Sequence, residues 1–131
     1  MKRVIAVLLL TAVVLSLCGC GKTPDDFTKE TYQLGKKALK VMDDYLAEKI
    51  DASKAEGKLS EIHDALEEDG KRIVPDPDSE NYGNELLQAM SNSMVAFEVS
   101  SFAMGMLGIK NSYGNLYDCE EVRDSLASLL E

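Results

Sequence analysis

The chain has 131 residues, of which 45% are hydrophobic and 28% charged, which fits one compact domain and leaves no room for a separate catalytic domain. Its 23 acidic and 14 basic side chains give a formal net charge of −9. Removing the N-terminal segment described below, which holds Lys2 and Arg3, lowers the net charge to −11. Proteins bind DNA or RNA through Lys and Arg that displace counterions, so this acidic chain is not expected to bind nucleic acid.

The first twenty residues follow the pattern of a secretory signal. Residues 1–3 form a short cationic start, and the fourteen residues 4–17 are apolar except for Thr11 and Ser16. As a helix this run spans roughly 21 Å at about 1.5 Å per residue, less than the ~30 Å hydrocarbon core of a bilayer. We therefore expect an export signal and not a permanent transmembrane helix.

The apolar run ends in Leu17-Cys18-Gly19-Cys20, which resembles the lipobox of bacterial lipoproteins. In that motif a Leu, a small residue and a Gly or Ala precede the Cys that becomes the lipidated first residue. Cleavage before Cys18 would place Leu17 directly before the cut, where the family uses a small residue. The resemblance therefore implies Cys20 as the lipid acceptor, and the alternative is an ordinary cleaved signal peptide.

A lipidated Cys20 implies a thioether-linked diacylglycerol, and two acyl chains anchor a protein stably to a membrane. The following Gly21 is not the Asp that retains such lipoproteins at the inner membrane of a two-membrane cell. The resemblance thus implies an exported protein anchored at the outer face of the cell membrane, or in an outer membrane where one exists. We expect residues 1–19 to be the signal peptide, 20–26 the lipidated Cys and a short tether, and 27–131 the folded domain.

From residue 27 onward, apolar residues recur at spacings of three and four, which predicts helices throughout. Asp51 and Asp118 are typical N-cap residues, and Gly70 is a typical C-terminal stop. The sequence predicts an all-α fold, a small antiparallel bundle of four helices with the third helix central. The predicted helices cover about 25–49, 52–69, 80–107 and 118–129.

Side chains that could carry catalysis are sparse in the folded part. His63 is the only histidine, and Cys119 is the only cysteine beyond the N-terminal segment, so neither a zinc site nor a disulfide is expected. Cys119 lies on the apolar stripe of the last predicted helix, where a small core residue belongs, and His63 lies at the edge of its stripe. A pairing of Cys119 as nucleophile with His63 as base is the less favoured interpretation. We expect no enzyme activity, no cofactor and no metal.

Two further acidic patterns have some features of functional sites. Residues 76–80 resemble the opening of an EF-hand loop, but the glycine and the bidentate glutamate of that loop are absent. A solvated loop is the favoured interpretation there, and a weak Ca²⁺ contact is the alternative. Glu67 and Glu68 do not form a glycosidase pair, because adjacent helical residues point apart.

The third predicted helix is the least polar, since Glu98 is the one charged residue between Met94 and Ile109. Such a helix is expected to be largely buried, with its methionines and phenylalanines in the core. If the other helices cannot cover it, the excess surface is a groove for a ligand or partner, or an oligomer contact. This candidate groove consists of Met90, Met94, Phe97, Glu98, Phe102 and Met106.

Glu98 belongs to a strip that repeats every seven residues along the third predicted helix, with Asn84, Ser91 and Gly105. We expect this polar or small strip to face water. The alternative makes Glu98 a buried acid that anchors a cationic group of a ligand or partner.

Two functions follow from these observations. The first is a lipid-anchored cell-envelope protein that acts as a non-catalytic interaction module for another exported protein. The alternative is a carrier or sensor for a small apolar ligand held in a cavity lined by Met and Phe. A closed cavity of roughly several hundred Å³ would favour the carrier, whereas a packed core with an exposed apolar strip would favour the interaction module. The sequence leaves the oligomeric state open.

The lipobox interpretation predicts different outcomes at its two cysteines. Cys20→Ala should leave the protein unprocessed or release it without lipid, whereas Cys18→Ala should change little, because Cys18 leaves with the signal. Metabolic labelling with a clickable fatty acid measures the lipid directly. Label that persists in Cys20→Ala would contradict the assignment.

Overall fold

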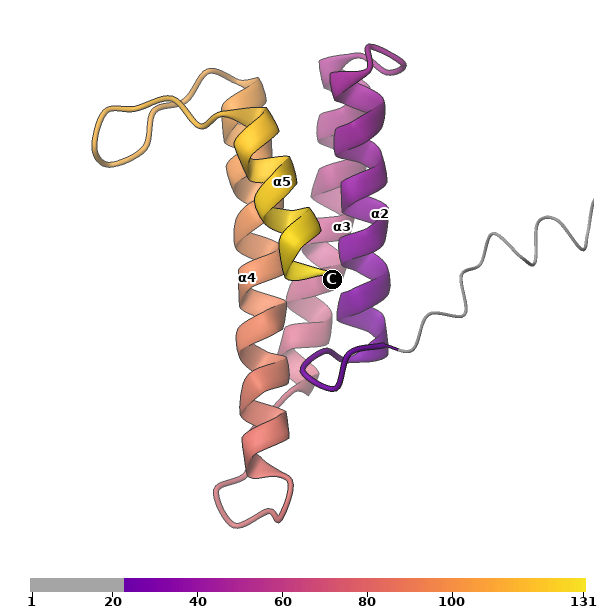
Figure 1. Ribbon diagram of the computed structural model, residues 1–131, viewed down its shortest axis with the longest axis vertical. Helices are drawn as coiled ribbons and strands as arrows, with labels where there is room; N and C mark the ends of the chain where they lie inside the picture. Colours follow the sequence, from indigo (N-terminus) through magenta and orange to yellow (C-terminus); the bar gives the residue numbers. More distant parts are fainter. Residues whose placement is uncertain (1–22) are drawn as a thin grey trace, which may run out of the picture.

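The computed structural model describes residues 23–131, and this part of the chain is an all-α bundle, as predicted (Figure 1). Its four helices are α2 (Lys29–Leu46), α3 (Ala52–Arg72), α4 (Tyr82–Met106) and α5 (Cys119–Leu129). The first three run alternately up and down, and the shorter α5 turns back along the C-terminal half of α4. The predicted signal peptide and Cys20 lie outside the described residues.

Side-chain caps set where three of the helices begin. Asp51 accepts a hydrogen bond from the backbone of Lys54, and Asp118 accepts two from the first turn of α5, so both predicted N-caps are confirmed. Thr28 caps α2 in the same way through the N–H of Thr31, at 2.9 Å. Because this cap lies at residue 28, α2 begins later than the predicted start near residue 25.

The predicted stop at Gly70 is wrong, because α3 continues to Arg72 and its C-cap is Ile73. Gly70 instead lies inside the helix, where Asn92 of α4 packs directly against it. A Cβ atom at this position would lie 2.7 Å from Asn92 Oδ1, closer than side chains normally approach. The glycine therefore serves the close approach of α4 to α3 and not the end of a helix.

The core lies between α2, α3 and α4, with α5 closing it at one end. Tyr45 and Phe102 meet edge to face with ring centroids 5.8 Å apart, which joins α2 to α4. Leu130 packs against Gly35 of α2, where an added Cβ would come within 2.8 Å of the leucine side chain. The buried apolar residues are Phe27, Leu34, Ala38, Val41, Met42, Ala55, Leu59, Ile62, Leu66, Val95, Val99, Phe102, Val122, Leu126 and Leu130.

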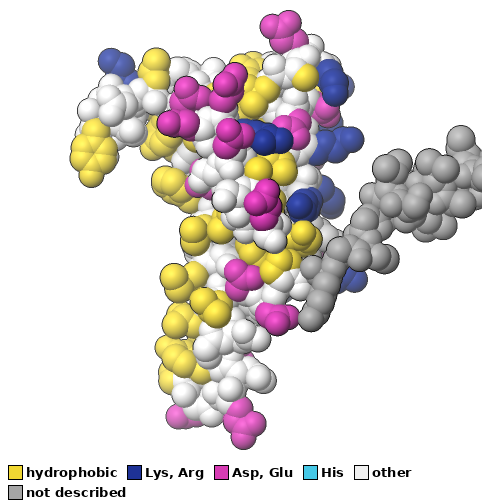
Figure 2. All heavy atoms as spheres, in the orientation of Figure 1, with side chains coloured by type: hydrophobic (Ala, Val, Ile, Leu, Met, Phe, Trp, Pro, Cys, Tyr) yellow, Lys and Arg dark blue, Asp and Glu magenta, His cyan; other side chains and the backbone are white. Residues whose placement is uncertain are grey.

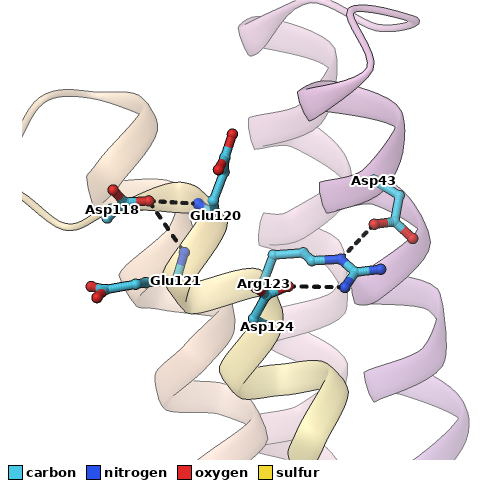
Figure 3. A network of polar contacts seen from close by, with 6 residues as sticks. All are labelled: Asp43, Asp118, Glu120, Glu121, Arg123 and Asp124. Carbon is cyan, nitrogen blue, oxygen red and sulfur yellow. Dashed lines mark hydrogen bonds and ion pairs between the residues drawn. The ribbon is translucent and has the colours of Figure 1, made fainter.

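An ion pair fixes α5 to α2 on the outside of this core (Figure 3). The Arg123 Nε donates to Asp43 Oδ1 at 2.7 Å, and its Nη1 donates to the neighbouring Asp124 at 3.0 Å. Arg123 is partly exposed, so the pair contributes little to stability and mainly sets the position of α5.

A buried polar cluster joins three helices at the opposite end. Asp69 of α3, only 7% exposed, accepts hydrogen bonds at 2.7 Å from the hydroxyl groups of both Thr28 and Thr31 at the start of α2. Asn92 of α4, 5% exposed, donates to Thr31 Oγ1 at 2.9 Å and to the backbone carbonyl of Leu66 at 3.1 Å. Each hydrogen bond offsets the cost of burying the two polar groups that it joins. Removing one side chain therefore leaves buried polar groups of the others without a partner.

No helix within residues 23–131 combines the length and the apolar character needed to cross a bilayer.

Thr31 is the shared member of the polar cluster, so its hydroxyl group should matter to stability. Thr31→Val removes a donor from Asp69 and an acceptor from Asn92, and should lower the free energy of unfolding by about 1–3 kcal/mol. Urea unfolding of the protein without its N-terminal segment measures this change. Ser60→Ala on the exposed face of α3 is the control, and should change stability by no more than ~0.5 kcal/mol. Equal stability of the two variants would show that the cluster is not a stabilising unit.

Candidate functional site

The rotation of α4 about its own axis decides which side chains reach the surface. Asn92, Val95, Val99 and Phe102 are buried and face the other helices. At 100° per residue, the opposite side of the helix carries the three exposed side chains Met90, Met94 and Phe97, together with Leu86 and Leu87 at its edges. The expectation that this helix is largely buried is therefore wrong, because α2, α3 and α5 together leave one side of it open.

These five residues, Leu86, Leu87, Met90, Met94 and Phe97, are called the apolar face of α4 below. Their exposed fractions run from 40% at Leu86 to 60% at Phe97. With about 200 Å² for a fully exposed side chain of this size, the apolar face presents roughly 500 Å² to solvent. Figure 2 shows hydrophobic side chains along the α4 edge of the molecule, while Lys and Arg gather over the α2 side. The largest apolar patch of a monomeric protein is typically about 300–600 Å² and is often functional.

A loop at the C-terminal end of α4 adds a second exposed apolar element. Residues 107–118, called the arm below, project from the bundle on the α4 side (Figure 1). The arm is held by a bridge between Lys110 and Leu116 and by Asn111, whose Oδ1 accepts from the backbone of Tyr113 and Asn115. Its exposed apolar side chains are Leu107 (58%), Ile109 (43%), Tyr113 (88%) and Leu116 (60%).

The five apolar residues of the predicted groove divide into two groups. Met90, Met94 and Phe97 lie together on the apolar face. Phe102 is completely buried, and Met106 packs partly buried against the core. The groove predicted from the sequence did not include Leu86, Leu87 or the arm. The spacing of three and four residues from Leu87 to Phe97 could have indicated that Leu87 lies on the same side of the helix as the methionines.

Glu98 is half-buried at the contact with α5, where Ser125 donates to its Oε1 at 2.6 Å. The predicted strip does not face water as a whole. Ser91 is buried, and a Cβ on Gly105 would lie 2.9 Å from Cys119 Sγ. Glu98 and Gly105 instead lie against α5 and the residues that precede it, whereas Asn84 is exposed as expected.

Two open hollows lie on the described part of the chain. The larger, about 550 Å³, runs between α3 and α4 and is lined by His63, Glu67, Gly70, Lys71, Ala89, Asn92, Ser93 and Ala96. The small side chains on the α4 side leave this space unfilled. No methionine lines it, and the exposed methionines of α4 do not enclose a cavity around an apolar ligand.

The candidate chemical groups lie apart from one another. His63 is on α3 and Cys119 is on α5, and these two helices make no contact with each other in the described structure. Cys119 is half-buried, with its Sγ 3.8 Å from the carbonyl of Phe102. Within residues 23–131, no three His, Cys, Asp or Glu side chains gather where they could hold a metal ion.

The acidic loop between α3 and α4 satisfies its own polar groups. Asp76 accepts from the backbone of Asp78, and the Glu85 carboxylate accepts from the backbone of Asp76 and from the hydroxyl group of Ser79. These contacts fix the start of α4.

Comparison with known proteins gives no match to this chain among family models, curated proteins or solved structures.

Burial, and secondarily the neighbouring Asp118 carboxylate, raises the pKa of the Cys119 thiol. The thiolate is the reactive form, so a raised pKa means that Cys119 should react slowly with maleimide at neutral pH and faster as the pH rises. A cysteine introduced by Ser112→Cys on the exposed arm is the internal comparison, and should react several times faster at pH 7. Unfolding in urea should remove the difference. Equal rates in the folded protein would contradict the assignment of Cys119 to the packed contact between α4 and α5.

Proposed function

We propose that this chain is a lipid-anchored protein of the cell envelope that acts as a non-catalytic interaction module. Its binding surface is the apolar face of α4, assisted by the arm. The observation that carries the proposal is the exposure of Met90, Met94 and Phe97 on the side of α4 opposite the core. Exposing apolar surface of this size to water is unfavourable, and a partner that covers this surface gains the free energy of burying it.

The N-terminal sequence supports the location. The Leu17-Cys18-Gly19-Cys20 motif makes Cys20 the anchor, and the core begins at Phe27, which is only 4% exposed. Phe27 is the seventh residue after Cys20, which allows a reach of at most about 25 Å at ~3.5 Å per residue. A short tether of this kind holds the bundle next to the bilayer and leaves its surfaces available to neighbouring exported proteins.

The exposed methionines favour an interaction surface over a carrier for small apolar molecules. A carrier surrounds most of its ligand with apolar side chains. Here Met90 and Met94 are 54% and 50% exposed on a convex helix surface. Methionine side chains are flexible and adapt to the shape of an apolar partner, which suits such a surface.

Photocrosslinking in intact cells tests the proposal. A benzoylphenylalanine at position 97 of the full chain should give an adduct of defined mass after irradiation, because this position lies in the middle of the proposed contact. The same group at Glu61, on the exposed side of α3, is the control and should give none. Met94→Asp should abolish the adduct from position 97, because an unpaired carboxylate is costly to bury. No adduct from position 97, nor from position 90, would overturn the proposal.

A further inference from the structure

We propose that α2 lies against the surface of the bilayer, with its exposed lysines on anionic lipid headgroups, so that the apolar face of α4 points away from the membrane. The lysines concerned, called the basic stripe below, are Lys29, Lys36, Lys37 and Lys40. This inference rests on the proposed function, because it requires the lipid on Cys20. It deepens that function by stating how the anchored bundle is oriented.

The basic stripe is a cationic surface on an acidic chain. Lys29, Lys36 and Lys40 are exposed and fall within about 40° of one another at 100° per residue, and the exposed Lys37 lies beside them. No acidic residue occurs in residues 31–42. Residues 51–131, by contrast, hold 17 acidic and 6 basic side chains, which is a net charge of −11 for that part of the chain alone.

The acidic side chains near the stripe leave its lysines available. Asp43 is bound by Arg123 at 2.7 Å, and Asp44 lies 3.6 Å from Lys49 Nζ, so each of these two carboxylates has a cation of its own. The other acidic residues close to the stripe in the sequence lie at the tether end of α2: Asp25, Asp26 and Glu30. Within residues 23–131, no ion pair involves a lysine of the stripe.

The attachment of the tether favours a bundle that lies on its side. The start of α2 is level with the middle of α4, because Thr31 Oγ1 lies 2.9 Å from Asn92 Nδ2. The tether therefore joins the bundle part-way along α4 and not at either end of it (Figure 1). Lys29 is the ninth residue after Cys20, which allows a reach of at most about 32 Å at ~3.5 Å per residue. The stripe extends only about 17 Å further along α2, so all four lysines can reach the surface that holds the anchor.

Electrostatics favours this orientation in a molecule that is already tethered. Each lysine near an anionic bilayer favours the contact about fivefold, so Lys36, Lys37 and Lys40 together favour it about 100-fold. The effect fades within a Debye length of about 10 Å, so acidic residues on the far side of the bundle oppose it little. Turning another side toward the bilayer would bring exposed acidic residues of α3, α5 or the loop 76–80 against the headgroups. A soluble anionic polymer could also bind lysines, but the tether holds only the bilayer next to the stripe.

The fold places the apolar face of α4 opposite the basic stripe. Within residues 23–131, α2 and α4 each contact both α3 and α5, whereas α3 and α5 do not contact each other. The helices α2 and α4 are therefore diagonal in the bundle, and their exposed sides face in opposite directions (Figures 1 and 2). With the stripe on the bilayer, Met90, Met94 and Phe97 point away from the lipid, where an exported partner can reach them.

Fluorescence quenching in vesicles tests this orientation. The full chain, purified with its lipid, carries bimane at Gln33→Cys in the middle of the stripe or at Met94→Cys on the apolar face, each in a Cys119→Ser background. The vesicles mix phosphatidylcholine with phosphatidylglycerol and contain a phosphatidylcholine with a nitroxide quencher on its headgroup. Quenching at position 33 should exceed quenching at position 94 by about fivefold or more, and this ratio should fall on vesicles without phosphatidylglycerol.

A matched pair of variants separates the stripe from net charge. Lys36→Glu with Lys40→Glu should bring the quenching ratio close to one, because the stripe then repels anionic headgroups. Lys71→Glu with Lys110→Glu changes the net charge by the same amount at exposed positions outside α2, and should leave the ratio unchanged. Unchanged circular dichroism verifies that the variants fold, as expected for substitutions of exposed side chains.

The other outcomes distinguish the two proposals. Equal quenching at positions 33 and 94, or a ratio that Lys36→Glu with Lys40→Glu leaves unchanged, overturns the proposed orientation. A photocrosslink from position 97 in intact cells then leaves the proposed function standing. Stronger quenching at position 94 means that the apolar face enters the bilayer, and overturns both proposals. A purified protein whose mass shows no lipid lacks the anchor that both proposals require, and also overturns both.

Discussion

The hydrogen bonds of Asn92 determine how α4 is rotated about its own axis. This rotation determines which side chains of α4 are exposed to solvent. Asn92 reaches into the cluster around Asp69 and donates to Thr31 Oγ1 and to the carbonyl of Leu66. A buried amide needs these partners, so α4 cannot rotate without leaving polar groups unpaired. The residues opposite Asn92 are Met90, Met94 and Phe97, and they face solvent for this reason.

Hydrophobicity alone would not select this orientation, because α4 is apolar on nearly all sides. Rotating the helix to bury Met94 and Phe97 would expose Val95, Val99 and Phe102, with little net change in buried apolar area. A cluster of hydrogen bonds worth a few kcal/mol is then enough to decide between the two orientations. Gly70 contributes by admitting Asn92 against the backbone of α3, where a larger residue would push α4 away.

This distinction explains what could be predicted from the sequence. Local patterns gave the four helices and the caps at Asp51 and Asp118, because these features depend on residues within one turn of each other. The cluster around Asp69 joins residues 38 to 61 positions apart, and no local pattern announces such a contact. The role of Gly70 and the exposure of the methionines both depend on that contact. The sequence therefore grouped Met90, Met94 and Phe97 with Phe102, whereas the structure exposes the first three and buries Phe102 on the opposite side of α4.

The arm has a consequence for the resistance of the protein to proteolysis. At its tip, Tyr113 is 88% exposed, and the next residue, Gly114, has a positive φ of 81°. Proteases cut chains that can be pulled into an extended form, and loop tips of this kind are where folded domains are first cleaved. An aromatic residue in such a loop suits enzymes that cut after large apolar side chains. Cleavage there would separate α5 from α4 along the chain, while the Arg123–Asp43 pair and the packing of Leu130 on Gly35 would hold the fragments together. A nicked molecule would thus keep its fold but lose a continuous arm.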